Sequence, residues 1–283
     1  MTTQQAGAAA TPQAGTPAPM QPAAPASRAW RIALEHVEAR LLAGELRPGD
    51  HLPPERQLAA DLGVSRSSVR EAIRVLEVLG LVRTATGSGP NAGAIIVASP
   101  DGGMSAVMRL HVAGHGFPVA DVVEARLVVE PAIAAHLARA HARNRRGPEQ
   151  TDAGARVDPG HMSSLHRASA LLDAMDTPDL EPAEFLALDA RFHVALAEAS
   201  GNTVLTATMA GLRDSIEGYV LQAVPNLPSW WATSARLRSE HRGIVEAILA
   251  GDDTDASRRV HAHVAGYYSE SRITQAQEHA TGS

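Results

Sequence analysis

Residues 64–76 read VSRSSVREAIRVL, and this stretch decides the fold of the first part of the chain. Its apolar residues Val69, Ile73 and Leu76 are three or four positions apart, so on a helix they share one face and pack inward. The first turn carries hydroxyl and guanidinium groups instead, on Ser65, Arg66, Ser67, Ser68 and Arg70. The pattern predicts a helix that begins at Ser65 or Ser67, ends near Leu79, and exposes a polar N-terminal turn.

Two further helices and two strands are predicted around this helix. The spacing of apolar residues predicts helices at 30–42 and 55–61, and Gly63 provides a tight corner after the second one. Short apolar runs at 81–83 and 94–97, separated by a segment rich in Gly, Ser and Asn, predict a two-stranded hairpin. Three helices followed by a hairpin is the order of a winged helix-turn-helix domain.

The polar first turn is suited to contact with double-stranded DNA. In a helix-turn-helix domain the second helix lies in the major groove, and its N-terminal residues reach base edges. The guanidinium of Arg66 or Arg70 can bind guanine, while hydroxyl groups and the helix dipole can hold backbone phosphates. The alternative is an exposed polar turn in which Ser65 or Ser67 only caps the helix. One such domain buries too little surface for tight selective binding, so we expect a homodimer on an inverted-repeat operator.

The formal net charge of −6 does not exclude DNA binding, because the charge is unevenly distributed. Residues 28–100 carry 9 arginines and 8 acidic residues, whereas residues 101–283 carry 16 arginines and 23 acidic residues. The absence of cysteine fits a reducing compartment. No apolar run is long enough to cross a membrane, and the N-terminus lacks a signal-peptide pattern. We therefore expect a cytoplasmic protein with no membrane partner.

The chain of 283 residues is long enough for two domains, and residues 1–26, mostly Ala, Pro, Gln, Thr and Gly, predict a disordered tail. A winged domain at 27–100 is followed at 101–277 by helical patterns without a convincing strand, and 278–283 should be a flexible C-terminus. The polar stretch 143–160 is expected to be an exposed loop. The fold class is mostly α, a winged helix-turn-helix followed by an antiparallel bundle of about seven helices. The expected helices of the bundle are 104–113, 119–142, 162–176, 182–199, 203–223, 230–250 and 253–277.

Asp189 and His193 have the spacing of two ligands on one face of a helix, four residues apart. Taken alone, a carboxylate and an imidazole at this spacing are more often a hydrogen-bonded pair. Two further histidines, His241 and His263, lie in later helices and are flanked by apolar residues, so we expect them to face the bundle interior. A bundle core is where side chains from facing helices converge on a metal ion. The four residues are therefore a candidate metal site.

The N-terminal pattern resembles the GntR family of bacterial regulators. The matching residues are 52–59 (LPPERQLA), 63–72 (GVSRSSVREA) and 76–82 (LEVLGLV). The resemblance implies a DNA-binding transcription regulator with a wing tip that enters the minor groove. The segment 84–93 is longer than the Gly-x-Gly turn common in the family. The DNA contacts that the resemblance implies come from Arg56, Ser65, Arg66, Ser68 and Arg70, and from Gly87 at the wing tip.

The helical half resembles the FCD ligand-binding domain of FadR-type members of this family. The similarity lies in 124–131 (EARLVVEP), 188–202 (LDARFHVALAEASGN), 240–242 (EHR), 247–252 (AILAGD) and 261–264 (HAHV). The metal ligands that the resemblance implies are Asp189, His193, His241 and His263. One oxygen and three imidazole nitrogens favour zinc, with nickel and manganese as alternatives. An octahedral ion would keep two adjacent positions open for the carboxylate of an effector.

Three further residues are candidates for contact with the effector. Arg126 lies four residues before Glu130, so it forms either a surface ion pair of little value or, as the resemblance implies, a clamp for a carboxylate. Arg213 is a candidate for the same pocket. Asn202 follows Ser200-Gly201 and either caps the next helix or contacts the effector.

The sequence thus predicts a regulator and not an enzyme. In this hypothesis a small organic acid binds at the metal site and pairs with Arg126. The two winged domains of a dimer then shift and release DNA, so repression is the expected outcome. A metalloenzyme would need a general base or nucleophile next to the cluster, and the sequence places none there. A purely structural metal without an effector stays open as a second alternative.

Overall fold

The structure is a computed structural model that describes residues 26–85, 93–97, 100–145 and 159–273. The described residues form two compact units, one of 26–45 with 53–72 and the other of 46–52 with the rest from 73 onward, and each is described by itself. The predictions that lie outside the described residues are the tail apart from Ala26, the wing tip with Gly87, residues 146–158 of the expected loop, and the C-terminus at 278–283.

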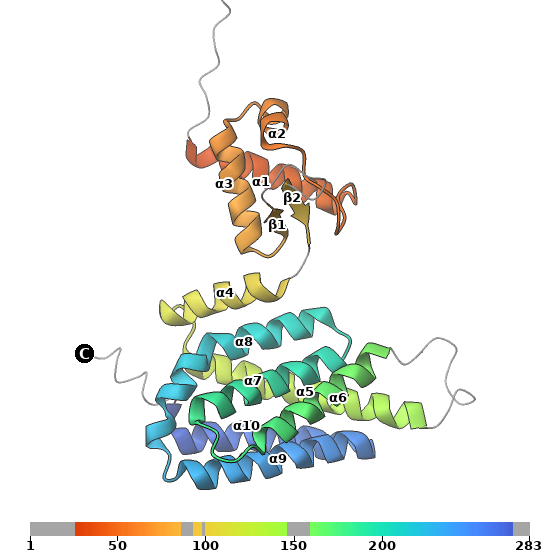
Figure 1. The fold of residues 1–283 in the computed structure, drawn as a ribbon, viewed down its shortest axis with the longest axis vertical. Helices are drawn as coiled ribbons and strands as arrows, with labels where there is room; N and C mark the ends of the chain where they lie inside the picture. The colour runs from red at the N-terminus through yellow and green to blue at the C-terminus, as the bar shows by residue number, and fades with distance from the viewer. Residues whose placement is uncertain (1–25, 86–92, 98–99, 146–158, 274–283) are drawn as a thin grey trace, which may run out of the picture. The chain divides into compact units, whose positions relative to one another are not determined.

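The first unit contains α1 (Ala26–Leu42), α2 (Glu55–Leu62) and the first turns of α3 (Arg66–Val78), as Figure 1 shows. The corner between α2 and α3 is closed by the backbone, because Gly63 N–H donates to the Ala60 carbonyl and Val64 N–H donates to the Ala59 carbonyl. Gly63 is left-handed, with a φ of 64°, as this helix ending requires. Ser65 Oγ accepts a hydrogen bond from Ser68 N at 3.1 Å and so caps α3.

The hairpin belongs to the second unit and consists of β1 (Val82–Ala85) and β2 (Gly93–Ile96). The strands are antiparallel with Val82 opposite Ile96, and Leu52 N–H extends the sheet by donating to the Ala94 carbonyl. β1 begins one residue later than predicted because Leu81 N–H still bonds to the Leu76 carbonyl at the end of α3. The order of three helices and a hairpin confirms the predicted winged helix-turn-helix.

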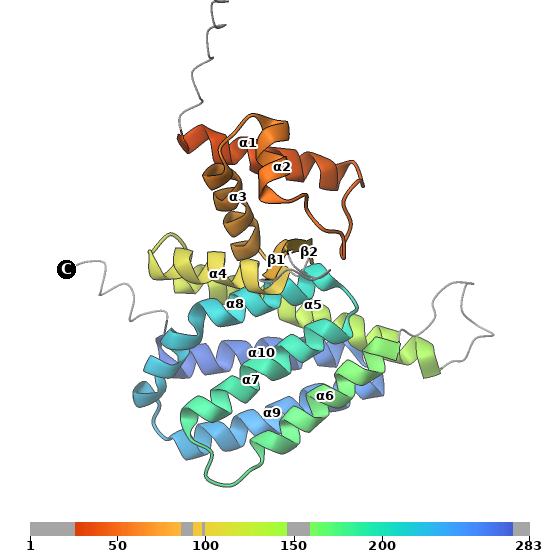
Figure 2. The same ribbon diagram turned by 45° about the horizontal axis from the view of Figure 1, so that its top comes forward.

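Seven helices follow the hairpin within the described residues, as predicted. Their bounds are α4 (Pro100–Ala113), α5 (Val119–Arg145), α6 (Pro159–Met175), α7 (Pro182–Ala199), α8 (Thr203–Gln222), α9 (Trp230–Ala250) and α10 (Asp253–Ser271). A short 3₁₀ helix at Val224–Asn226 separates α8 from α9. Sequence neighbours α6 and α7 pack together, and so do α9 and α10, while α10 also packs on α5 and α8 on α4 (Figures 1 and 2). Side chains of α7, α9 and α10 meet in one interior region of the bundle.

Helix ends in the bundle follow local signals, with a few differences from prediction. Asn202, Ser229 and Asp252 cap α8, α9 and α10 through side-chain oxygens that accept backbone N–H groups. α5 extends to Arg145 and α6 begins at Pro159, so residues 143–145 and 159–160 of the predicted loop are helical, and the rest of that prediction lies outside the described residues. α10 ends at Ser271 and not at 277. No helix in the described ranges is long and apolar enough to span a lipid bilayer.

Within the described residues the core of the bundle is mainly apolar, with a few buried hydroxyl side chains and one cluster of charged and imidazole groups. Fully buried Phe185, Phe192, Leu237, Ile244 and Ile248 come from α7 and α9. Charged and imidazole groups of Arg126, Glu130, Asp189, Arg213 and three histidines are buried within the same bundle. Since an unpaired charge in such a core is costly, the arrangement of these groups is the main structural question.

Candidate metal centre and nucleic-acid interface

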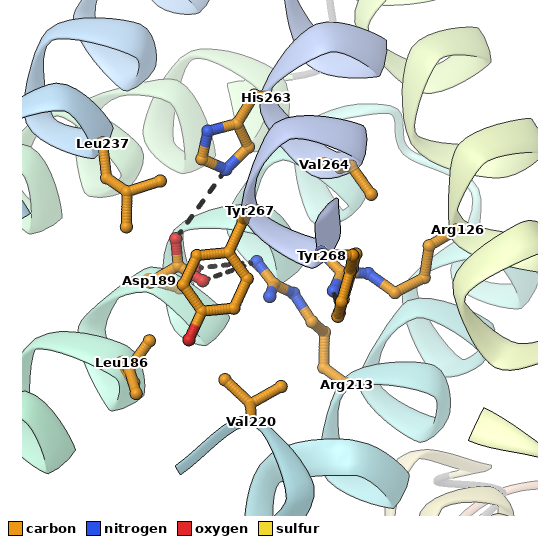
Figure 3. A pocket seen from close by; sticks show the side chains of 10 residues that line it. All are labelled: Arg126, Leu186, Asp189, Arg213, Val220, Leu237, His263, Val264, Tyr267 and Tyr268. Carbon is orange, nitrogen blue, oxygen red and sulfur yellow. Dashed lines mark hydrogen bonds and ion pairs between the residues drawn. The ribbon is translucent and has the colours of Figure 1, made fainter. Parts of the chain in front are cut away.

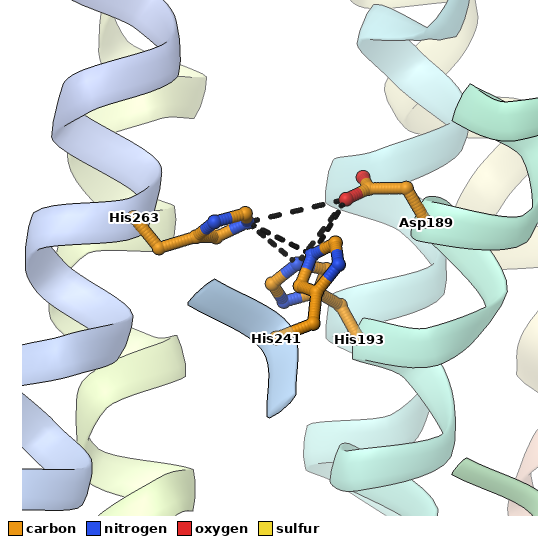
Figure 4. Close-up of side chains that lie close together, drawn as sticks. All are labelled: Asp189, His193, His241 and His263. Atoms are coloured by element: carbon orange, nitrogen blue, oxygen red, sulfur yellow. Dashed lines mark hydrogen bonds and ion pairs between the residues drawn. The ribbon is translucent and has the colours of Figure 1, made fainter. Parts of the chain in front are cut away.

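The four residues predicted as metal ligands converge in the bundle core. Asp189 and His193 lie one turn apart on α7, while His241 comes from α9 and His263 from α10 (Figure 4). All four side chains are buried, and one ligand atom from each lies within 4.8 Å of the others. Helical i, i+4 spacing aligns the first two, and helix packing supplies the other two.

The distances between donor atoms suit a single ion. His263 Nε2 lies 3.2 Å from His193 Nε2 and 3.2 Å from His241 Nε2. Asp189 Oδ1 lies 2.9, 3.7 and 3.9 Å from the Nε2 atoms of His241, His193 and His263, respectively. Two ligand atoms that share an ion at about 2.1 Å are separated by roughly 3.0 to 3.4 Å, so these four atoms already stand close to coordination geometry.

Two carboxylates outside the cluster, Glu130 and Glu240, face the Nδ1 atoms of His193 and His263 and so favour the tautomers whose Nε2 lone pairs point toward the centre of the cluster. His193 Nδ1 lies 2.6 Å from Glu130 Oε2, and His263 Nδ1 lies 2.8 Å from Glu240 Oε2. A proton on His263 Nδ1 donates to Glu240, and a proton on His193 Nδ1 would face Glu130 at ion-pair distance, although Glu130 Oε2 completes no hydrogen bond among the described residues. A proton on Nδ1 leaves a lone pair on the Nε2 of the same ring. The two Nε2 lone pairs then face each other at 3.2 Å and repel. A cation among the four ligand atoms would replace this repulsion by attraction, so the donor set fits a divalent metal.

The buried charges around the cluster are arranged in pairs. Arg126 bonds to Glu130, and Arg213 Nη2 lies 2.9 Å from Asp189 Oδ2. Burial opposes the charge on Glu130, but Arg126 and His193 outweigh it and hold the pKa of this carboxyl well below its usual value. Burial likewise opposes the charge on Asp189, yet Arg213 and the histidines hold its pKa well below normal. Both carboxylates are therefore anionic and available to balance a cation.

Two of the histidines, His241 and His263, are held in their neutral, metal-binding form. Burial and the neighbouring His241 lower the pKa of His263 from 6.5 to about 3. Burial also lowers the pKa of His241. Within the described residues His241 Nδ1 has no hydrogen-bond partner. Since only neutral imidazole can donate a lone pair to a metal, the environment favours ligation at physiological pH.

A small cavity lies directly beside the cluster (Figure 3). Its volume is about 20 Å³, which is room for about one water molecule. Its polar wall contains Arg126 and Arg213 together with the cluster residues Asp189 and His263, and Tyr268 accepts a hydrogen bond from Arg126. Apolar side chains complete the lining, with Leu186, Val220, Leu237 and Val264. Two cationic side chains and the candidate metal site thus face the same small space.

The three residues predicted to contact an effector lie in different places. Arg126 forms the ion pair with Glu130 that the spacing suggested. Because Arg126 is only 2% exposed, the pair is buried, and the alternative of a surface ion pair is wrong. Arg126 and Arg213 line the cavity, whereas Asn202 does not. Asn202 Oδ1 accepts hydrogen bonds from Val204 N and Leu205 N, which is the capping alternative. Asn202 borders a separate surface groove between α5 and the start of α8.

The predicted DNA-contacting side chains lie on α2 and the first turn of α3. Arg56, Ser65, Arg66, Ser67 and Arg70 are exposed, while Ser68 is buried with its hydroxyl 2.8 Å from Ser65 Oγ. Arg70 pairs with Glu55 at 2.9 Å, an exposed ion pair that DNA phosphates can replace at little cost. The described residues thus keep two arginines of α3 accessible for contact with a duplex.

Sequence reasoning missed four residues around the cluster. The contact of Glu130 with His193 and that of Glu240 with His263 join different helices, and no spacing along the chain signals them. Tyr267 and Tyr268 line the cavity. Tyr267 could have been found, because it follows His263 by four residues and therefore shares its helix face.

Comparison with known proteins identifies both halves of the chain. Residues 32–90 match the family of bacterial regulatory proteins called gntR, and residues 151–266 match the FCD domain. A protein of Escherichia coli strain K12, named as an L-lactate dehydrogenase operon regulatory protein, is 29% identical over 230 residues, covering 81% of each chain. The HTH-type transcriptional repressor NanR of Cronobacter sakazakii is 29% identical over 237 residues, covering 81% of this chain and 80% of its own.

A solved structure shows the same fold. The GntR protein of Streptococcus agalactiae superimposes with a TM-score of 0.55 at 23% identity, covering 85% of this chain and 99% of its own. The family matches and the relatives agree on one class of protein, a DNA-binding transcription regulator. The chain therefore belongs to the GntR family and carries the FCD domain of its FadR-type members.

Proposed function

We propose that this regulator is a cytoplasmic repressor whose affinity for its operator is lowered by a small carboxylate bound beside a metal ion in the helical bundle. The observation that carries the proposal is the cluster of four buried ligand atoms, all within 4.8 Å, next to a cavity lined by Arg126 and Arg213. Arg126 and Arg213 pair with Glu130 and Asp189, and both also line the cavity, where they could bind an anionic ligand.

The metal would be held by Asp189, His193, His241 and His263, with zinc favoured and nickel or manganese as alternatives. When bound, it would supply a positive centre with room in its coordination shell for a carboxylate oxygen. Glu130 and Glu240 orient two of the histidines through Nδ1, at 2.6 and 2.8 Å. Arg126 and Arg213 would contribute directional N–H donors to the same anion.

The size of the cavity links binding to a change in conformation. A volume of about 20 Å³ is too small for even a short organic acid, so binding must displace side chains such as Arg213 from Asp189. A ligand shifts a conformational equilibrium only if it binds one state better than the other. An acid that binds the widened state would therefore favour that state. A relative named for an L-lactate dehydrogenase operon supports a small carboxylate as the effector class.

DNA binding would use two copies of the winged domain. Arg56, Ser65, Arg66, Ser67 and Arg70 would contact one half-site from each copy of a homodimer, and the wing tip with Gly87 would lie in the minor groove. Ser68 would contribute through its hydroxyl bond to Ser65, which positions the first turn of α3. Two half-sites on an inverted repeat supply the affinity that one domain lacks.

The test begins with double-stranded DNA selected by the protein from a random library. Fluorescence anisotropy then measures operator affinity with and without acetate, glycolate, L-lactate, succinate, malate and citrate. We expect at least one acid to weaken binding about tenfold or more in metal-loaded protein and to have no effect after chelation. Arg258→Ala, an exposed arginine of α10, serves as the control and should respond as the wild type does. Operator affinity that is indifferent to every acid would contradict the proposal.

A second candidate function is a purely structural metal without an effector, and the small volume of the cavity, about 20 Å³, favours it because no organic acid fits without a change in conformation. In that case chelation lowers the melting temperature, but no acid changes either the melting temperature or operator affinity. In our proposal an acid raises the melting temperature of the metal-loaded protein and not that of the chelated protein, because binding to the folded state alone stabilises it. Differential scanning fluorimetry with and without chelator separates the two.

A further inference from the structure

The hydroxyl group of Tyr267 is buried and has no hydrogen-bond partner in the part of the chain that the structure describes. Tyr267 lies on α10 and is 7% exposed, and its hydroxyl makes no hydrogen bond to any described residue. Burial of a polar group without a hydrogen bond is costly, and most buried hydroxyls in folded proteins are satisfied. The described residues therefore supply no hydrogen-bond partner that would offset the cost of burying this hydroxyl.

The unpartnered hydroxyl lines the cavity beside the metal cluster. In Figure 3 the hydroxyl oxygen of Tyr267 is directed toward the side of the cavity formed by Leu186 and Val220, away from His263. A second polar atom of the same cavity, Arg213 Nε, is also buried without a hydrogen-bond partner among the described residues. Two unused donors thus face one space, and both would be satisfied by a ligand with acceptor oxygens.

The neighbouring Tyr268 differs from Tyr267, because its buried hydroxyl has a hydrogen-bond partner. Tyr268 lines the same cavity and is equally buried, but its hydroxyl accepts a hydrogen bond from Arg126. Burial raises the pKa of Tyr267, so its hydroxyl stays protonated and can donate at neutral pH. The side chains Leu186 and Val220 beside it offer no polar partner.

We propose that the Tyr267 hydroxyl binds a second oxygen of the effector, a hydroxyl or oxo group apart from the carboxylate that pairs with the arginines. Tyr267 is then the residue that selects hydroxy- or oxo-carboxylates over acids of the same length that lack this oxygen. The inference rests on the proposed function and deepens it, because it names the effector class and the side chain that reads it. A site with an unused buried donor discriminates against a ligand that leaves the donor unpaired.

The first experiment needs no ligand. Three variants each remove one hydroxyl: Tyr267→Phe, Tyr268→Phe and Tyr219→Phe, the last on a half-buried residue of α8. We expect Tyr267→Phe to leave the melting temperature unchanged or raise it, because it removes an unsatisfied buried group. Tyr268→Phe should lower the melting temperature, because it removes the partner of Arg126. If Tyr267→Phe lowers it as much as Tyr268→Phe, the Tyr267 hydroxyl has a structural partner and the proposal is overturned.

The second experiment measures discrimination between matched acids. Glycolate is compared with acetate, L-lactate with propionate and malate with succinate, by the dissociation constants that thermal-shift titrations of the metal-loaded protein give. The wild type should bind the oxygen-bearing member of at least one pair about tenfold more tightly. In Tyr267→Phe that ratio should fall toward one, while Tyr219→Phe should keep the wild-type ratio.

The outcomes separate this proposal from the one on which it rests. Binding of acids with equal affinity within every pair supports the proposed function and refutes the role of Tyr267. A wild-type preference that survives in Tyr267→Phe also refutes that role. Failure of every acid to stabilise the metal-loaded protein refutes both proposals.

Discussion

The substitution Glu240→Gln tests whether a carboxylate outside the cluster strengthens metal binding. Glu240 Oε2 lies 2.8 Å from His263 Nδ1 and fixes the tautomer whose Nε2 faces the other ligands. Glutamine keeps the size of the side chain but removes the charge, and its amide can rotate to donate to Nδ1 and so favour the wrong tautomer.

The magnitude follows from the type of hydrogen bond. A bond to a charged acceptor contributes about 1.5 to 3 kcal/mol, against about 1 kcal/mol for a neutral one. The difference of roughly 0.5 to 2 kcal/mol corresponds to about 2- to 30-fold in affinity, and its upper part overlaps the roughly 10- to 100-fold loss that is typical when such partners of metal-bound histidine are removed. We therefore expect Glu240→Gln to weaken zinc binding about tenfold, measured by competition with a chromophoric chelator.

Glu270→Gln is a matched control on the same arginine. Arg236 bridges Glu240 at 2.6 Å and Glu270 at 2.5 Å, and Glu270 also accepts a hydrogen bond from Thr233. No contact of Glu270 with a histidine is found among the described residues. Both variants remove one negative charge next to Arg236, so a general electrostatic effect would weaken zinc binding in both. Only an effect through His263 is confined to Glu240→Gln. Equal zinc affinity in the two variants, or no loss in Glu240→Gln, would refute the reasoning.

Two further predictions concern acidification and DNA contact. In chelated protein the unfolded chain protonates its histidine near pH 6.5, whereas folded His263 stays neutral down to about pH 3, so stability falls as the pH falls between these values. His263 should lower the free energy of unfolding, measured with urea, by about 2 kcal/mol between pH 7 and pH 5. His263→Gln should remove this part of the pH dependence. His261→Gln, on the exposed side of α10, should leave the pH dependence unchanged. Arg66→Ala should reduce the slope of log affinity for DNA against log salt by about one if its guanidinium contacts a phosphate, and an unchanged slope and affinity would exclude Arg66 from the interface.

The local features of this protein follow from its sequence. Gly63 marks the left-handed end of α2, Ser65 caps α3, and the spacing of Val69, Ile73 and Leu76 buries one face of that helix. Each of these depends on residues within a few positions of one another, where backbone geometry leaves few choices. The number of bundle helices was predictable for the same reason.

Helix packing decided how the functional groups meet. The spacing of Asp189 and His193 fixed one half of the metal cluster, while the convergence of His241 and His263 on it depends on how α9 and α10 pack against α7. The ion pair of Arg126 with Glu130 was visible in the sequence as an alternative, but its burial was not.

The sequence by itself determined the helices, their caps, the polar turn of α3 and the candidate ligands, because each rests on short-range spacing. Only the tertiary structure decided that Glu130 and Glu240 face His193 and His263, and that the Tyr267 hydroxyl has no partner among the described residues. Such contacts join helices far apart in the chain, and their existence depends on angles and depths of packing that no local pattern encodes.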